Sequence, residues 1–177
     1  MKNIEVEIRA FVSEIQYKKL LSFFKKNAEL VKEDNQETIY FDCPQDLRIQ
    51  KNDFTSKIWL KGGRLHDDCR EEIEIHTEKD NFEKLQKLFQ YLGYKEEIIW
   101  LRKRTEFKWE DITVDIDYTK GYGYIIELEK IGTSDEKKKI LKLLRLKLEE
   151  LKIAETSKEE FNMAYENYKT NWKKLIN

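Results

Sequence analysis

The sequence contains few cysteines, a single proline and no long apolar run. Its two cysteines, Cys43 and Cys69, lie in no CxxC motif or Cys/His cluster. This argues against a zinc site or a disulfide-stapled secreted scaffold and favours free thiols in a reducing compartment. No stretch approaches the roughly 18 apolar residues of a membrane span, and no apolar signal segment precedes the first predicted strand. We therefore expect a cytoplasmic protein without a membrane partner.

The chain also lacks a net charge of either sign. Its 34 Lys and Arg side chains balance 35 Asp and Glu side chains, so the formal net charge is −1. A generally basic nucleic-acid-binding protein is disfavoured, and so is an acidic tail. The lysine-rich stretch at 137–147 is flanked by Glu136 and Glu149 and carries apolar residues at helical spacing. It is better explained as an amphipathic helix than as an RNA-binding surface, and we expect no nucleic-acid partner.

The 177 residues fit one domain, which we place over 1–177, and no repeat or linker divides it. Alternation of apolar and charged residues in 4–9 predicts a first strand that ends near Val12. Further strands are predicted at about 38–42, 47–51, 57–61, 70–76, 98–109, 112–118 and 123–131. Helices are predicted to begin after Ser13, Asp80, Thr133 and Ser157, each followed by Gln or Glu three residues later, and the last two occupy 134–175.

This succession of elements predicts an α+β protein. Many short antiparallel strands tend to avoid open edges by closing, so an eight-stranded barrel with helices packed outside is favoured over a flat sheet. The aromatic residues of 161–172 lie three or four positions apart, the spacing of a packed helix face, and are predicted to be core.

Charged residues recur two positions apart, or four in the case of Lys57 and Lys61, on most of the predicted strands, which places them on one face of the sheet. The pairs are Glu5/Glu7 with Arg9, Lys57/Lys61, Arg70/Glu72 with Glu74, Arg102/Arg104, Asp115/Asp117 and Glu127/Glu129. Strand by strand, a solvated face with cross-strand ion pairs is the simpler interpretation. In a closed barrel, however, the same face points inward, where unpaired charges are costly unless they bind something polar. Carboxylates suit Mg²⁺ or Mn²⁺ and basic residues suit phosphate, so the mixture favours a metal–triphosphate complex.

The segment Glu5-Val6-Glu7-Ile8-Arg9 resembles the N-terminal ExExK signature of the CYTH superfamily, the triphosphate tunnel metalloenzymes. This family includes class IV adenylyl cyclases, thiamine triphosphatases and inorganic triphosphatases. Later segments follow in the family's order and extend the resemblance over 4–131: Thr38-Ile39-Tyr40-Phe41-Asp42, Leu47-Arg48-Ile49, Trp59-Leu60-Lys61-Gly62, Arg70-Glu71-Glu72, Arg102-Lys103-Arg104, and Asp117 through Gly121-Tyr122-Gly123 to Glu127-Leu128-Glu129.

The resemblance implies an eight-stranded antiparallel tunnel that grips a triphosphate with the help of Mg²⁺ or Mn²⁺. The implied metal ligands are Glu5, Glu7, Glu127 and Glu129, with Glu72 and Asp117 as ligands or orienters, and Glu5, Glu7 and Glu127 would be catalytic. The implied phosphate-binding residues are Arg9, Arg48, Lys61, Arg70, Arg102 and Arg104.

Two departures from the family pattern stand out. Arg9 replaces the signature lysine, which keeps the charge but changes a compact ammonium into a planar fork. Gln50 stands where many triphosphatases place a second basic residue.

The substrate and the reaction stay open at this point. ATP, thiamine triphosphate and tripolyphosphate are all candidates. Attack by water would make the protein a triphosphatase, whereas attack by a ribose 3′-hydroxyl on the α-phosphate would make it a cyclase. The non-enzymatic alternative is a tunnel that binds a polyphosphate or nucleotide without turnover. The oligomeric state is open as well, a homodimer being one option.

Overall fold

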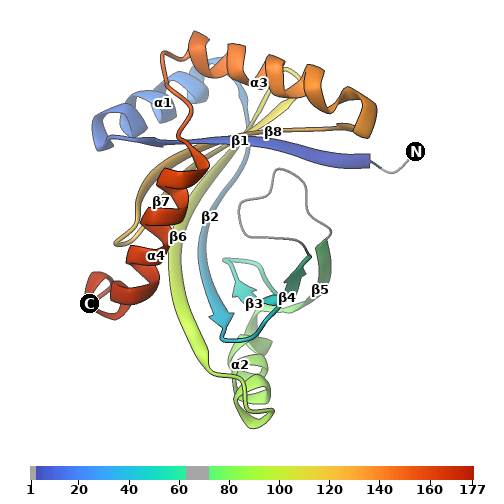
Figure 1. Cartoon of the computed structure of the whole chain (residues 1–177), viewed down its shortest axis with the longest axis vertical. Coiled ribbons are helices and arrows are strands. Elements are labelled where there is room, and N and C mark those ends of the chain that lie inside the picture. The colour runs from blue at the N-terminus through green and yellow to red at the C-terminus, as the bar shows by residue number, and fades with distance from the viewer. Residues whose placement is uncertain (1–2, 63–71) are drawn as a thin grey trace.

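The computed structural model describes residues 3–62 and 72–177, and in these ranges it shows an α+β fold built on one antiparallel sheet (Figure 1). The strands are β1 (Asn3–Val12), β2 (Glu29–Phe41), β3 (Asp46–Lys51), β4 (Thr55–Lys61), β5 (Glu72–Glu78), β6 (Glu96–Trp109), β7 (Ile112–Thr119) and β8 (Gly123–Thr133). The α-helices are α1 (Glu14–Asn27), α2 (Phe82–Tyr91), α3 (Lys137–Glu150) and α4 (Lys158–Leu175).

The eight strands are ordered β1-β8-β7-β6-β2-β3-β4-β5. The long strands β2 and β6 pair along most of their length and connect a half that holds β1, β8 and β7 with a half that holds β3, β4 and β5. The sheet bends between these halves, so that its two ends lie on the same side (Figure 1). The predicted tunnel architecture is confirmed, but in the described residues no backbone ladder joins the terminal strands β1 and β5.

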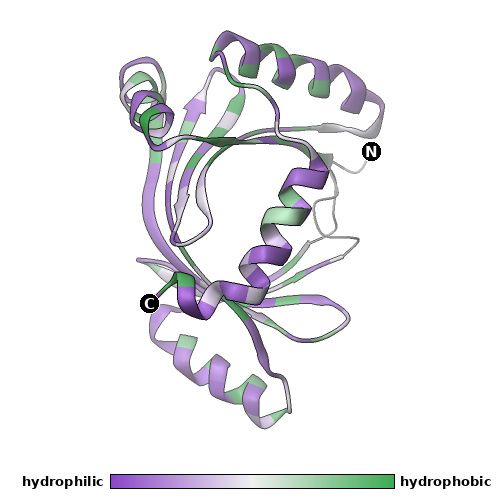
Figure 2. Ribbon diagram, turned by 60° about the vertical axis from the view of Figure 1, so that its left-hand side comes forward, coloured by the Kyte–Doolittle hydropathy of each residue, from purple (hydrophilic) through white to green (hydrophobic). Residues whose placement is uncertain are grey.

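Two apolar cores lie on the outer face of the sheet. Helices α1 and α3 cover β1, β8, β7 and part of β6, where Val6, Ile8 and Phe24 belong to the larger core. Helix α2 covers β3, and its Phe82 packs with Ile39 and Phe41 in the smaller one. Figure 2 shows these helices outside the curved sheet, their apolar residues interspersed with polar ones. The outer face of the sheet is thus covered by apolar packing against helices, which leaves the inner face for polar side chains.

Helix α4 is an exception because it packs on the inner face. Its buried Tyr165 and Tyr168 lie in a third apolar cluster with Ile98 and Trp100, which share a face of β6 with Arg102. The Tyr168 hydroxyl donates a hydrogen bond of 2.9 Å to the Ile99 carbonyl. The prediction that the aromatic stripe of this helix is core is confirmed, and the helix closes off one part of the concave face.

Several local predictions are confirmed. Capping boxes form at Ser13, Thr133 and Ser157, where the side chain of residue three positions later also binds the cap backbone. Gly93 follows α2 with a φ of +91°, a conformation that favours glycine. In the described part of the chain, no helix is both long and apolar enough to cross a membrane.

Two element boundaries were predicted wrongly. Strand β2 begins at Glu29 rather than near Thr38, because hydrogen bonding to β6 holds a segment whose charged sequence shows little strand periodicity. Helix α2 begins at Phe82 after a 3₁₀ turn over Lys79–Asn81, and no side chain caps it, so Asp80 does not open the helix as predicted.

Candidate functional site

The candidate site lies on the inner face of β1, β8, β7 and β6. On β1, the inward positions Glu5, Glu7 and Arg9 alternate with Val6 and Ile8, which are buried in the outer core. The strands place inward charged residues opposite one another: Glu7 pairs with Glu129, Arg9 with Glu127, Asp115 with Glu127, and Arg104 with Asp117. Eight of the predicted site residues are therefore brought together on four adjacent strands: Glu5, Glu7, Arg9, Arg102, Arg104, Asp117, Glu127 and Glu129.

Arg104 is at the centre of an acidic group. Its Nη1 lies 2.5 Å from Asp115, and its Nη2 lies 2.6 Å from both Asp117 and Glu127. Burial alone would lower the pKa of Arg104, but the three carboxylates hold it well above its ordinary value. The guanidinium of Arg104 is thus surrounded by three acidic side chains of the protein itself.

Glu127 is the carboxylate most strongly held in its charged form. Burial would raise its pKa, but Arg104, Arg9 and Arg102 outweigh this effect and lower the pKa to about 2. Arg9 lies 3.9 Å from Glu127 on β8 and 3.2 Å from Glu7 on its own strand β1, so its guanidinium connects β1 with β8. Glu127 therefore stays ionised at neutral pH.

The pKa values of the neighbouring carboxyl groups are shifted in the opposite direction, upward. Burial and the charge of Glu5, with which it shares a hydrogen bond, raise the pKa of Glu129 to about 8. Burial and the charge of Glu127 raise the pKa of Glu7. Such mutual repulsion is relieved when a cation is placed between the groups.

Asp115 was not on the list of predicted site residues, although its spacing from Asp117 had marked it as inward. Burial raises its pKa to about 7 despite the neighbouring Arg104. Its Oδ2 faces Arg104, whereas its buried Oδ1 has no hydrogen-bond partner among residues 3–62 and 72–177. A buried acceptor without a donor is unusual in a native fold and fits a ligand that the carboxylate would bind.

These donors fit a hard divalent cation by their chemistry. Glu5, Glu7, Asp115, Glu127 and Glu129 supply carboxylate oxygens, which Mg²⁺ and Mn²⁺ prefer. As they stand within residues 3–62 and 72–177, no three or more Asp, Glu, His or Cys side chains are close enough together to hold a metal ion. The carboxylates instead form a row along β1, β8 and β7.

The other predicted basic residues have different surroundings. Lys61 on β4 reaches the vicinity of Glu7, where its charge counteracts the rise in the pKa of Glu7, so β4 faces β1 across the interior. The ammonium groups of Lys57 and Lys61 lie 3.8 and 4.0 Å from the ring centroid of Trp59. Lys57 forms an ion pair with Glu74 at 2.6 Å, so Lys61 is the lysine of this pair that acts on the carboxylate row.

Arg48 is not brought into the same cluster. Its Nε and Nη2 each donate to Asp46 at 2.6 Å, and its guanidinium lies between the rings of Tyr40 and Trp59. Asp46 thus engages Nε and Nη2 of this buried guanidinium, and the phosphate-binding role of Arg48 stays a prediction. Arg70 and the side chain of Glu72 lie outside the described residues.

Comparison with known proteins agrees with this geometry. The family model of the CYTH domain matches residues 3–161. A Methanocaldococcus jannaschii protein named "Putative adenylate cyclase MJ0240" is 33% identical over 162 residues, which cover 85% of this chain and 91% of that protein.

Solved structures share the fold. A conserved hypothetical protein from Pyrococcus furiosus superimposes with a TM-score of 0.69 at 26% identity, covering 85% of this chain and 91% of that one. A "putative adenylyl cyclase" from Hippeastrum, described as having a dominant triphosphatase activity, superimposes with a TM-score of 0.65 at 19% identity, covering 90% and 94%. The match over nearly the whole length, together with the curved sheet and its charged inner face, shows that the chain belongs to the CYTH domain family.

Proposed function

We propose that this protein is a divalent-metal-dependent enzyme that acts on a small molecule carrying a triphosphate. The observation that carries the proposal is the row of crowded carboxylates beside Arg9, Arg102 and Arg104 on one concave face. The row ends at Asp115 Oδ1, which has no partner in the described part of the chain. Binding of an anion alone calls for positive charge, and inward carboxylates would repel it. A carboxylate row beside arginines is suited to a cation and a phosphate chain together.

In the proposed mechanism, Glu5, Glu7, Glu127 and Glu129 would hold Mg²⁺ or Mn²⁺, with Asp115 adjacent to them. The ion would supply charge stabilisation at the phosphoryl oxygens. Arg9 and Arg102 would bind phosphate oxygens and neutralise the negative charge that grows on the leaving group, while Lys61 would approach from the opposite wall. Asp117, bonded to both arginines of β6, would orient them.

Two reactions fit this arrangement. Attack of water on the terminal phosphorus breaks its bond to the bridging oxygen and releases orthophosphate. Attack of the ribose 3′-hydroxyl of ATP on the α-phosphorus forms cyclic AMP and releases pyrophosphate. The name of the Methanocaldococcus jannaschii relative supports the cyclase, and the described activity of the Hippeastrum protein supports the triphosphatase.

The proposal is tested by offering ATP, thiamine triphosphate and tripolyphosphate with Mg²⁺, with Mn²⁺ and with a chelator, and by identifying the products by phosphorus NMR. We expect turnover of at least one substrate that requires the metal. Glu127→Gln should remove it, and Lys139→Ala on the exposed face of α3 is the matched control. Tight binding of all three without turnover would instead support a binding protein and overturn the enzymatic proposal.

A further inference from the structure

The surroundings of Arg102 differ from those of Arg104, although both point inward from β6. Arg104 contacts three carboxylates, whereas Arg102 makes its two shortest hydrogen bonds to a neutral amide. Its Nε and Nη2 donate to the Oε1 of Gln36, directly across on β2, at 2.9 and 2.6 Å. A longer bond of 3.3 Å joins its Nη1 to Asp117.

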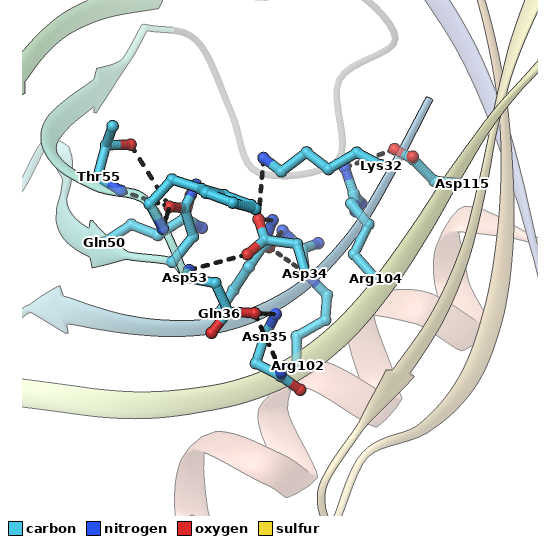
Figure 3. A network of polar contacts seen from close by, with 12 residues as sticks. Lys32, Asp34, Asn35, Gln36, Gln50, Asp53, Thr55, Arg102, Arg104 and Asp115 are labelled. Atoms are coloured by element: carbon cyan, nitrogen blue, oxygen red, sulfur yellow. Dashed lines mark hydrogen bonds and ion pairs between the residues drawn. The ribbon is translucent and has the colours of Figure 1, made fainter. Parts of the chain in front are cut away.

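The orientation of the Gln36 amide is set from the other side (Figure 3). Gln36 Nε2 donates to Asp34 Oδ2 at 3.2 Å, which directs the amide oxygen toward the guanidinium. Asp34 is itself fully buried and held by the backbone N–H of Asp53 at 3.0 Å and by Lys32 at 2.9 Å. If the amide were rotated, its N–H₂ group would face the N–H groups of Arg102, donor against donor.

This arrangement determines which edge of the guanidinium is available. An arginine has five N–H donors, and Gln36 and Asp117 together engage three of them. In the described residues, one N–H on each terminal nitrogen of Arg102 is left after these contacts, and each can bind a phosphate oxygen. Because the amide is neutral, it orients Arg102 without cancelling its charge.

We infer that Gln36, oriented by Asp34, is a positioning residue that presents Arg102 to a phosphate group of the substrate without adding a negative charge of its own. The inference rests on the proposed function and assigns the main phosphate contact of β6 to Arg102 rather than Arg104. Neither Gln36 nor Asp34 falls within a strand that the sequence pattern predicts.

The test uses tripolyphosphate as the probe and isothermal calorimetry as the measurement, with and without Mg²⁺. Gln36→Met keeps the length of the side chain but removes the acceptor, and Gln36→Glu keeps an acceptor but adds a charge that would neutralise Arg102. We expect each variant to bind tripolyphosphate about tenfold more weakly, as for one charge-assisted hydrogen bond. In an Arg102→Ala background, Gln36→Met should change the affinity less than about twofold.

The matched control is Gln50→Met, which removes another buried amide of the inner face; among the described residues this amide bonds Thr38 and no arginine. Any effect of this control should be equal in both backgrounds. Thermal unfolding establishes whether each variant is folded. If Gln36→Met does not fold, the affinity of Gln36→Glu for tripolyphosphate tests the inference in its place. Wild-type affinity in the folded Gln36 variants, or an equal loss from Gln36→Met in both backgrounds, would overturn the inference. Wild-type affinity of Arg102→Ala itself would instead count against the phosphate site of the proposed function.

Discussion

The guanidinium of Arg9 on β1 lies over the ring of Phe161 on α4, with 5.2 Å between its Cζ and the ring centroid. Phe161 is buried and also stacks on Phe11. A planar guanidinium can rest on an aromatic ring while its edges face Glu7 and Glu127, which a compact ammonium does less well. The contact gives a physical reason for arginine at the position where the family signature has lysine.

Arg9→Lys should therefore lower kcat/KM for the best substrate several-fold, because the shorter side chain loses both the stacking contact and the bidentate geometry. The measurement is steady-state kinetics at saturating Mg²⁺. Arg145→Lys is a suitable control, since this exposed arginine on α3 pairs with Glu155, away from the inner face. A several-fold rise in kcat/KM would mean that Arg9 is not an adapted ligand.

Glu127→Gln and Glu5→Gln should each abolish metal-dependent turnover while the protein stays folded. Each substitution removes one negative charge with little change of shape, and Glu127 is the carboxylate whose low pKa keeps it charged throughout the neutral range. Turnover and Mg²⁺ titrations of the purified variants measure the effect, with circular dichroism as the check on folding. If both variants kept wild-type activity, the metal assignment would be wrong.

Arg102→Ala and Arg104→Ala should differ in their effect on the stability of the fold. Loss of Arg102 should weaken triphosphate binding by about 1.5–3 kcal/mol, the size of a hydrogen bond to a charged group. Loss of Arg104 should also weaken binding, but it leaves Asp115, Asp117 and Glu127 without their shared cation, so it should lower the melting temperature more than Arg102→Ala. Calorimetry and thermal unfolding separate the two effects. An affinity loss in Lys139→Ala larger than in either arginine variant would place the binding site on α3 instead.

The stability of the metal-free protein should depend on the protonation of Glu129. Folding raises the pKa of this carboxyl from an ordinary value of 4.5 to about 8, so the folded state binds the proton more tightly than the unfolded state. The resulting stabilisation is complete below about pH 4.5 and is lost as the pH rises through 8.

Urea unfolding of wild type and Glu129→Gln between pH 5 and about 9 in the presence of a chelator checks this prediction. The free energy of unfolding of the wild type should fall relative to that of the variant as the pH rises, and Mg²⁺ should reduce the fall. Parallel curves for the two proteins would show that Glu129 titrates at the same pH folded and unfolded.

Much of the site could be predicted from local patterns. Alternation along β1, β7 and β8 correctly predicts that Glu7, Asp117 and Glu127 face away from the apolar core, because successive side chains of a strand point to opposite faces whatever its neighbours. Capping boxes at Ser13 and Ser157 correctly predict two helix starts, because their hydrogen bonds join residues only three positions apart and so are local as well.

The roles of individual charges could not be predicted in this way. Arg48 and Arg102 are both inward arginines in the sequence pattern, yet one is locked to Asp46 between two aromatic rings and the other is held by a neutral amide. Gln36 was not predicted as a site residue, because most of β2 shows little strand periodicity in its sequence and is held as a strand by its pairing with β6.

The sequence by itself determined the strand faces, the helix caps and the inward set of carboxylates and basic residues, because these depend on contacts within a few residues. Only the tertiary structure decided which of those charges meet. Strand register placed Arg104 among three carboxylates and Arg102 against Gln36, and the return of α4 to the inner face brought Phe161 to Arg9. Cross-strand and helix–sheet contacts join residues far apart in the chain, and their energies depend on distances that no local pattern contains.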